Sequence, residues 1–281
     1  MRPFLTQLRW EFRKLRARPA TYFGFAACAL WSLAGSLLLR VPAVRLHIQR
    51  DLWRMQWDFE KTFSGLTTAT HFMGEAMTLA GSLSLTLVAA GMLAGEAEDG
   101  SMRMTFCRPI SRTRVLALKL IVCAVYSTAL TCFVAASALG VGLLFEGPGP
   151  LIMVATHESV LGAFDFSTGL QRYALASALL AVSALSGTLF SFTCACFPVK
   201  PATAIALALT LTFADNSIRA APSMAHVAPY CLTTRLIAWR QVFNEDIPIA
   251  RLRRLYGQLL AIDAALLAIA WSAFRRREFK R

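Results

Sequence analysis

Residues 96–112 combine acidic side chains, a short amphipathic stretch and helix-ending residues at close spacing. Three acidic residues open the segment, and the amphipathic stretch follows at 101–107. Pro109 ends this stretch, and Ser111 is placed to cap the helix that comes next. The pattern predicts a short surface helix. Such a helix can transmit a movement of a soluble partner to the rest of the molecule. An ordinary charged loop is the alternative, and the residue types favour neither.

Asp263 is a single carboxylate inside the apolar run 257–274. A charged group at the depth of a bilayer is costly, so its side chain should face a partner or water. Two roles fit this position. One is contact with a substrate or proton, and the other is a hydrogen bond that packs two helices together. The sequence leaves both open.

Gly91 and Gly95 form a small-xxx-small motif, Gly91-Met-Leu-Ala-Gly95. Small residues allow helices to approach one another closely in a membrane. The motif predicts either a contact between two subunits or helix packing inside one subunit, and it does not distinguish them.

Patterns for nucleotide binding and catalysis are missing from the sequence. A P-loop needs a Gly-Lys pair, because its backbone N–H groups and its lysine hold the phosphates, and the chain has no Gly-Lys dipeptide. Cys194 and Cys196 would point ~200° apart on a helix, which prevents them from sharing a metal. We therefore expect no catalytic residues, no metal and no bound cofactor, and any ATP and Mg²⁺ chemistry must belong to a separate subunit.

The elements that must position these residues are membrane helices. Apolar residues make up 56% of the 281 residues and charged residues 16%, against ~45–50% and ~25% in soluble domains. A membrane helix needs ~20 largely apolar residues. Six runs meet this requirement: 21–39, 76–95, 120–145, 173–197, 201–218 and 257–274. The net charge of +13 then indicates residues that flank membrane helices, and we expect no nucleic-acid partner.

The distribution of Lys and Arg predicts the orientation. With a cytoplasmic N-terminus, the inner segments hold 17 basic residues in 54 positions, and the outer segments hold 12 in 101. Since basic residues favour the cytoplasmic side, both termini are predicted to be cytoplasmic.

Residues 1–20 are predicted to form an amphipathic helix at the membrane surface. Phe4, Leu8, Phe12 and Leu15 fall on one face, with arginines beside them. Such a helix places its apolar face among the lipid chains and its guanidinium groups at anionic headgroups. Two outer loops also carry apolar residues at helical spacing, at 44–59 and 232–243.

The segment 96–119 resembles the coupling-helix region of ABC-2 type ABC transporter permeases. The matching positions are Glu96, Gly100, Ser101, Met102, Pro109, Ile110, Ser111, Arg112 and Lys119. The stretch Glu11-Phe-Arg-Lys14 is similar to the amphipathic helix that precedes the first span in this family. The six-span layout and the basic tail at 275–281 also agree with the family pattern.

The resemblance implies an all-α membrane protein with one transmembrane domain over residues 1–281 and a coupling region at 96–112. The chain would pair with a second permease subunit, as a homodimer or heterodimer, in a prokaryotic plasma (inner) membrane. Each subunit would dock a separate ABC ATPase and move a substrate, with export the commoner direction. The residues implied to couple to that ATPase are Glu96, Glu98, Gly100, Ser101, Met102, Arg103, Phe106, Pro109 and Arg112.

Two other classes of membrane protein are weaker alternatives. A secondary carrier that works without an ATPase usually has several intramembrane charges and internal repeats, whereas here only Asp263 lies deep in a run. A membrane scaffold has no sequence signature that would exclude it. A stable complex with an ATPase would distinguish a permease from both.

Overall fold

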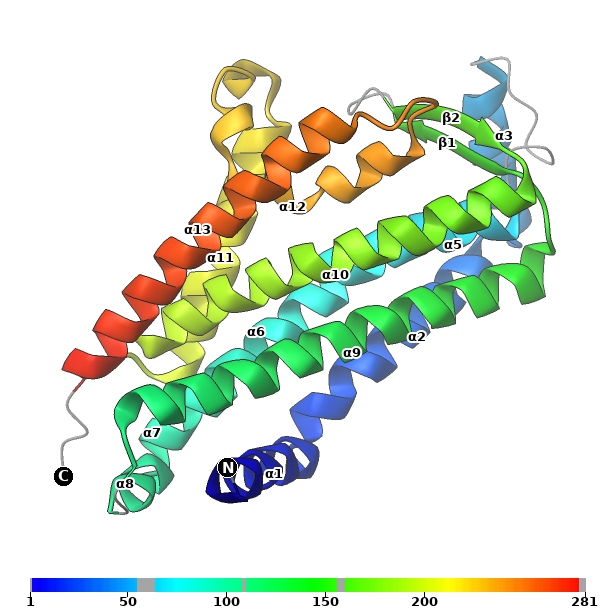
Figure 1. Cartoon of the computed structure of the whole chain (residues 1–281). Helices are drawn as coiled ribbons and strands as arrows, with labels where there is room; N and C mark the ends of the chain where they lie inside the picture. Colours follow the sequence, from blue (N-terminus) through cyan, green and yellow to red (C-terminus); the bar gives the residue numbers. More distant parts are fainter. Residues whose placement is uncertain (1, 55–63, 108–109, 156–159, 278–281) are drawn as a thin grey trace.

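The computed structural model describes residues 2–54, 64–107, 110–155 and 160–277. This part of the chain is a bundle of long helices with a small β-hairpin at one end (Figure 1). The short helices α7 (Glu96–Glu98) and α8 (Ser101–Phe106) lie at the opposite end, which we call the α8 end. The end that carries the hairpin is called the hairpin end.

Five helical stretches are long and apolar enough to cross a membrane. They are α2 (Pro19–Leu38), the continuous helix from α5 to α7 (Gly65–Glu98), α9 (Arg112–Glu146), α10 (Phe166–Cys196) and α13 (Ile249–Arg276). The predicted span 201–218 is also helical, as α11 (Pro201–Ala220), but it does not belong to this apolar group. A sixth span therefore stays a prediction.

Several helices begin earlier than the apolar runs indicated, because polar residues cap them outside those runs. The helix predicted to start at 76 begins at Gly65, where the Ser64 side chain accepts a hydrogen bond from the Thr67 N–H. The predicted Ser111 cap is confirmed, since its side chain accepts from the Arg114 N–H. A cap lowers the free energy of a helix end whose first N–H groups have no partner within the helix.

The helix Gly65–Glu98 is interrupted by two π-helical turns. They are η1 (Met77–Gly81) and η2 (Gly91–Gly95), separated by α6 (Ser82–Ala90). Single π turns inside α-helices are rare and frequently mark functional sites. The second turn covers the predicted small-residue motif and runs directly into α7.

The helix α9 is central to the packing and lies against α2, α5 and α10. Glycines allow its close approach to α5. A side chain on Gly142 would collide with the backbone oxygen of Gly65. These helices enclose a core of buried apolar residues that includes Leu66, Leu130 and Phe192.

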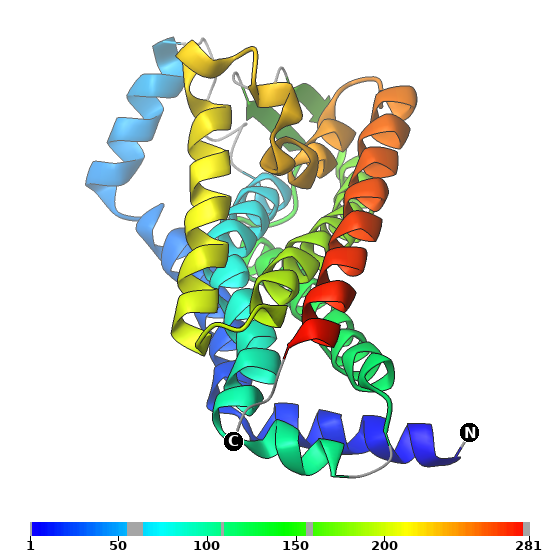
Figure 2. The same cartoon turned by 90° about the vertical axis from the view of Figure 1, so that its left-hand side faces the viewer.

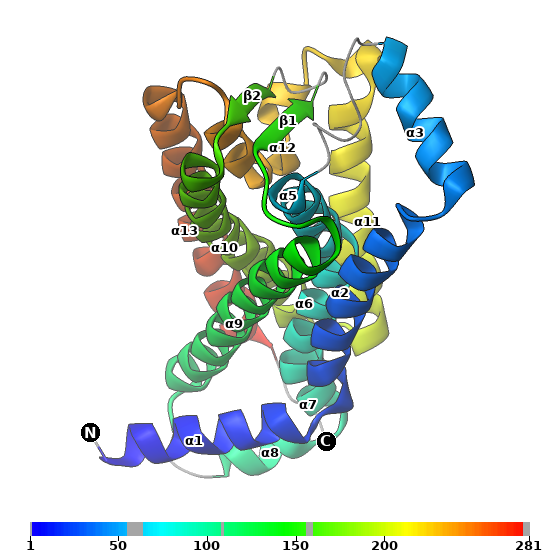
Figure 3. The ribbon, with the colours of Figure 1, turned by 90° about the vertical axis from the view of Figure 1, so that its right-hand side faces the viewer.

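The N-terminal helix α1 (Arg2–Ala17) lies across the α8 end, beside α8, instead of along the bundle (Figures 2 and 3). Leu15 is buried, and Leu8 and Phe12 are partly buried against the core. Part of the face predicted to enter lipid thus rests on the chain's own helices, whereas Leu5 and Trp10 are exposed. Its location at a bilayer surface stays a prediction.

The hairpin end contains the departure from an all-α fold. Strands β1 (Leu151–Ala155) and β2 (Val160–Phe164) pair antiparallel, with Leu151 opposite Phe164. The predicted spans 120–145 and 173–197 left only a loop between them. The helix α3 (Pro42–Arg54) extends away from the bundle near this end (Figure 3). It covers part of the helix predicted at 44–59, whose last five residues lie outside the described ranges.

Short helices between α11 and α13 cover the hairpin end of the bundle. They are η3 (Pro222–Met224), η4 (Ala228–Tyr230), α12 (Leu232–Leu236) and η5 (Ala238–Phe243). The helical spacing expected at 232–243 is present, with Trp239 and Phe243 buried. Asp215 of α11 fixes this segment, because one of its carboxylate oxygens accepts from both N–H and Oγ1 of Thr233, each at 2.7 Å.

Candidate functional site

A turn at Gly100 separates α7 from α8. The φ angle of Gly100 is 73°, in the left-handed region that favours glycine. Across the turn, Ser101 Oγ donates to the carbonyl oxygen of Glu96 at 3.2 Å. Thr105 Oγ1 then donates to the carbonyl oxygen of Ser101 at 3.1 Å. These bonds connect α8 directly to the end of the membrane helix that precedes it.

The two faces of α8 differ in exposure. Met102 is 1% exposed, and Phe106, one turn later, packs partly buried against the core. Met104, between them, is 71% exposed. Glu98, just before the turn, is also exposed. The helix is therefore attached to the bundle by one face and leaves the apolar side chain of Met104 exposed on the other.

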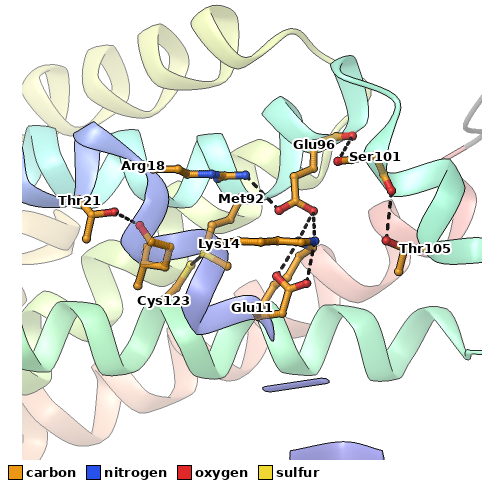
Figure 4. Close-up of polar contacts among 11 residues, drawn as sticks. Glu11, Lys14, Arg18, Thr21, Met92, Glu96, Ser101, Thr105 and Cys123 are labelled. Atoms are coloured by element: carbon orange, nitrogen blue, oxygen red, sulfur yellow. Dashed lines mark hydrogen bonds and ion pairs between the residues drawn. The ribbon is translucent and has the colours of Figure 1, made fainter. Parts of the chain in front are cut away.

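Glu96 lies at the centre of five charged side chains that form the charge cluster: Glu11, Lys14, Arg18, Glu96 and Lys119 (Figure 4). Lys119 Nζ lies 2.7 Å from Glu96 Oε2. Arg18 Nη2 lies 3.0 Å from Glu96 Oε1, and Lys14 Nζ lies 3.4 Å from Glu96 Oε2. Both lysines also lie 3.1 Å from an oxygen of Glu11.

The charge cluster joins three helices at the point where α8 begins. Glu11 and Lys14 belong to α1, Glu96 to α7 and Lys119 to α9, and Arg18 lies between α1 and α2. The side chains of Lys119 and Glu96 are only 1% and 4% exposed. Removing such groups from water costs several kcal/mol per ion, and only well-placed partners offset that cost. The cluster therefore fixes α1, α7 and α9 relative to one another.

The neighbouring charges change the pKa of two members of the cluster on α1. Burial alone would raise the pKa of Glu11, but the ammonium groups of Lys119 and Lys14 outweigh it and hold that pKa below its usual 4.5. Burial would lower the pKa of Lys14, and the carboxylates of Glu96 and Glu11 instead raise it above its usual 10.5. Both groups are charged at neutral pH.

These shifts predict how the stability of the α1 attachment depends on pH. The pKa of Glu11 is lowered, so the contribution of Glu11 to folding stability is present above about pH 4.5. This contribution is lost as the pH falls through the folded-state pKa. The raised pKa of Lys14 means that its contribution is present below about pH 10.5 and is lost as the pH rises through the folded-state pKa.

Thermal unfolding of the detergent-purified protein, measured from about pH 3 to pH 8, checks the acidic side of this prediction. Stability should fall as the medium becomes acidic, and Glu11→Gln should reduce that fall. Glu98→Gln changes an exposed carboxylate near the cluster and should leave the acidic fall unchanged. An identical pH profile for Glu11→Gln and the unmodified chain would contradict the prediction.

The last residue of α8 and the first residue of α9 contact the end of α13. The rings of Phe106 and Phe274 lie 6.4 Å apart. Arg112 Nη1 donates to the carbonyl oxygens of Arg275 at 2.7 Å and Arg277 at 2.9 Å. The predicted coupling region is therefore fixed on one side by the charge cluster and on the other by the end of α13.

The remaining predicted site residues are Gly91 and Gly95, Arg103 and Pro109, and Asp263. Gly91 is adjacent to the charge cluster, since a Cβ there would lie 3.2 Å from Arg18 Nη1, while a role of Gly91 and Gly95 in a subunit contact stays a prediction. Arg103 belongs to α8, but its side chain lies outside the description, as does Pro109.

Asp263 lies on α13 and accepts a hydrogen bond from Ser186 Oγ of α10 at 2.7 Å. This bond joins α13 to α10, which is the packing contact that was one of the two roles expected for Asp263. Contact of Asp263 with a substrate or proton stays a prediction.

The sequence predicted no site role for the other four members of the charge cluster. Glu11 and Lys14 were matched to the family's amphipathic first helix, Lys119 was matched to the family pattern before the next span, and Arg18 was counted only among the basic residues of segment 1–20. One signal was available, because 11, 14 and 18 recur at helical spacing and therefore share a face. Nothing in the sequence indicated that this face meets positions 96 and 119.

The comparison with known proteins agrees with this architecture. The family model described as ABC-2 family transporter protein matches residues 7–215, which include α8 and the whole charge cluster. The chain belongs to this family and is a multi-pass permease component of an ABC transporter, as the resemblance of the 96–119 segment indicated. A search of curated proteins found no match.

Proposed function

We propose that this chain exports its substrate as half of a permease dimer, with α8 receiving the force of ATP hydrolysis from a separate ABC ATPase. Membership of the ABC-2 transporter family supports a partner of this kind. The observation that carries the proposal is the attachment of α8. Its buried face packs on the bundle, its first residue is bonded to Glu96, and Met104 remains 71% exposed.

The charge cluster provides a route for the force. A displacement of α8 pulls on Glu96, whose carboxylate is held by Lys119 of α9 and Arg18 beside α2. Because these ions are buried, separating them costs far more than shifting them together. The helices that share the cluster are therefore expected to move as one unit. A displacement of α8 would then rearrange the membrane helices.

In this proposal the partner subunit binds ATP and Mg²⁺, and this chain supplies the docking surface and the membrane path. Both termini lie on the cytoplasmic side, together with α1 and α8. The excess of basic residues in the segments at this side supports that orientation. The lipids around the bundle and a second permease subunit complete the assembly.

The exposed face of α8 gives a direct test of ATPase docking. Met104→Glu places a charge on this face and should abolish, or reduce by about tenfold, the recovery of a stoichiometric P-loop ATPase with the tagged chain, since a desolvated unpaired charge weakens an interface by several kcal/mol. Met224→Glu is the matched control, because Met224 is also exposed but lies in η3 at the hairpin end.

Mass spectrometry of the complexes extracted in mild detergent measures the recovery. Equal ATPase recovery with Met104→Glu and Met224→Glu would contradict docking at α8. Absence of any ATPase from the intact unmodified protein would contradict the proposed function as a whole and favour the carrier or scaffold alternatives.

A further inference from the structure

A cavity lies between helices away from the charge cluster, on the hairpin-end half of α11. It encloses about 140 Å³, close to the ~150 Å³ of an engineered apolar cavity that binds benzene. Its walls come from η1 and α6, the middle of α10, the second half of α11, and α12 with η5. It is therefore built from four separate parts of the chain.

The wall of this cavity is apolar with scattered hydroxyl groups and carries no formal charge. Among the twenty described residues that line it, none is ionisable. A charged ligand would lose its hydration there without gaining a counter-ion, and such a burial is strongly unfavourable. The lining thus selects for an uncharged molecule with a substantial apolar part.

The hydroxyl groups in the wall are arranged as acceptors. Thr78 donates its proton to Gly74 O, Thr86 to Ser82 O and Thr212 to Ala208 O, each at 2.8 Å. Their protons are used inside the helices, whereas each hydroxyl oxygen still has lone pairs. The amide of Asn216, whose oxygen accepts from Arg219, adds a donor. A ligand hydroxyl both donates and accepts, so it matches this wall.

The wall also includes part of a π-helical turn. Met77 and Thr78 belong to η1, and both line the cavity. Such turns are rare and frequently occur at functional sites. Met77 adds a flexible, polarizable side chain that adapts to ligands of different shape. A distortion of the membrane helix thus coincides with an enclosed space.

We propose that this cavity binds an uncharged amphipathic alcohol, with the hydroxyl on the Thr and Ser side chains and the apolar part against Leu and Phe side chains. Only the further step, that this molecule is the exported substrate, rests on the proposed function. The binding itself can be tested on the chain without an ATPase.

Gly187 allows the cavity to be filled without disturbing the fold. It lines the cavity, and a Cβ placed there meets no atom within 4 Å. Gly187→Leu therefore adds a side chain in the open space. Gly257→Leu is the matched control, because Gly257 is also a helical glycine with no atom within 4 Å of a Cβ but does not line the cavity.

The probe is 4-(trifluoromethyl-diazirinyl)benzyl alcohol, which attaches covalently to nearby residues under light. Labelled peptides of the detergent-purified chain are identified by mass spectrometry. We expect label in 77–86 and 180–191, about tenfold less in Gly187→Leu and no change in Gly257→Leu. Benzyl alcohol should compete, benzyl methyl ether should compete about two- to tenfold more weakly, and benzoate should not compete.

A second variant removes one acceptor and keeps the shape of the wall. Thr212→Val should weaken competition by benzyl alcohol about two- to tenfold without affecting benzyl methyl ether. Labelling that is the same in Gly187→Leu and Gly257→Leu, or equal competition by benzoate and benzyl alcohol, would overturn the proposal. Neither result would depend on ATPase docking at α8, so failure of this inference and failure of the proposed function are distinguishable.

Discussion

Glu96→Gln is expected to destabilise the protein by about 3–5 kcal/mol, the usual effect of removing one partner from a buried ion pair. The change keeps the size of the side chain and removes its charge. Lys119, which is 1% exposed, and Lys14 would then retain Glu11 as a carboxylate partner, while Arg18 would lose the carboxylate that it contacts. Three cations would face one anion in a largely buried space.

Glu98→Gln is the matched control for this prediction. The same chemical change is made two residues away, on a side chain that is exposed, and substitutions of this kind usually change stability by less than about 0.5 kcal/mol. Unfolding of the detergent-purified variants measures the difference. A Glu96→Gln variant as stable as Glu98→Gln would show that the charge cluster does not hold the α8 end together.

The same pair of variants tests the route of the force. In a reconstituted complex, Glu96→Gln should separate ATP hydrolysis from transport, because the residue whose carbonyl oxygen accepts from Ser101 of α8 would no longer be held in place by its carboxylate. Glu98→Gln should keep the two activities coupled. Normal coupling in a well-folded Glu96→Gln complex would exclude the cluster from force transmission.

The sequence predicted the membrane helices well because their main signal is local. Each charge-free apolar run corresponds to a helix, since its residues must be buried in lipid or protein. The helix starts were harder, because polar first turns such as the one after Ser64 resemble loop sequence. The π turns had no signal, since Met77–Gly81 and Gly91–Gly95 have the composition of an ordinary apolar helix.

The hairpin was missed although its pattern is visible in the sequence. Leu151–Ala155 and Val160–Phe164 are two short apolar runs separated by four residues. That spacing is typical of a β-hairpin. The expectation of a plain loop between two spans took precedence over this local pattern.

The candidate site was predictable in part only. The position of α8 followed from Pro109, Ser111 and the acidic residues before them. The charge cluster did not, because it depends on contacts between positions 11, 96 and 119, which only the tertiary structure brings together. A charge beside an apolar run ordinarily indicates a flanking residue in water, so the burial of Lys119 could not be inferred from the sequence.

Lys119→Met should destabilise the protein less than Glu96→Gln, although Lys119 is the more deeply buried of the two. Methionine replaces the lysine with an apolar side chain of similar length. Both carboxylates of the charge cluster then keep Lys14, and Glu96 also keeps Arg18. The remaining two anions and two cations balance, whereas Glu96→Gln leaves an excess of two positive charges. We expect a loss of about 1–3 kcal/mol, from the hydrogen bonds that Lys119 no longer makes.

The two substitutions should also be non-additive, because the residues they change are 2.7 Å apart. In a double-mutant cycle, residues within one ionic network show interaction energies of about 0.5–3 kcal/mol. The double variant should therefore be more stable than the sum of the single effects predicts, since Lys119→Met removes the buried cation that loses its closest partner in Glu96→Gln. Lys200→Met, on an exposed lysine in the α10–α11 turn, should add to Glu96→Gln without interaction. Equal behaviour of Lys119→Met and Lys200→Met in the cycle would mean that Glu96 is held by its neighbours on α1 and not by α9, and α9 would then have no part in receiving the force from α8.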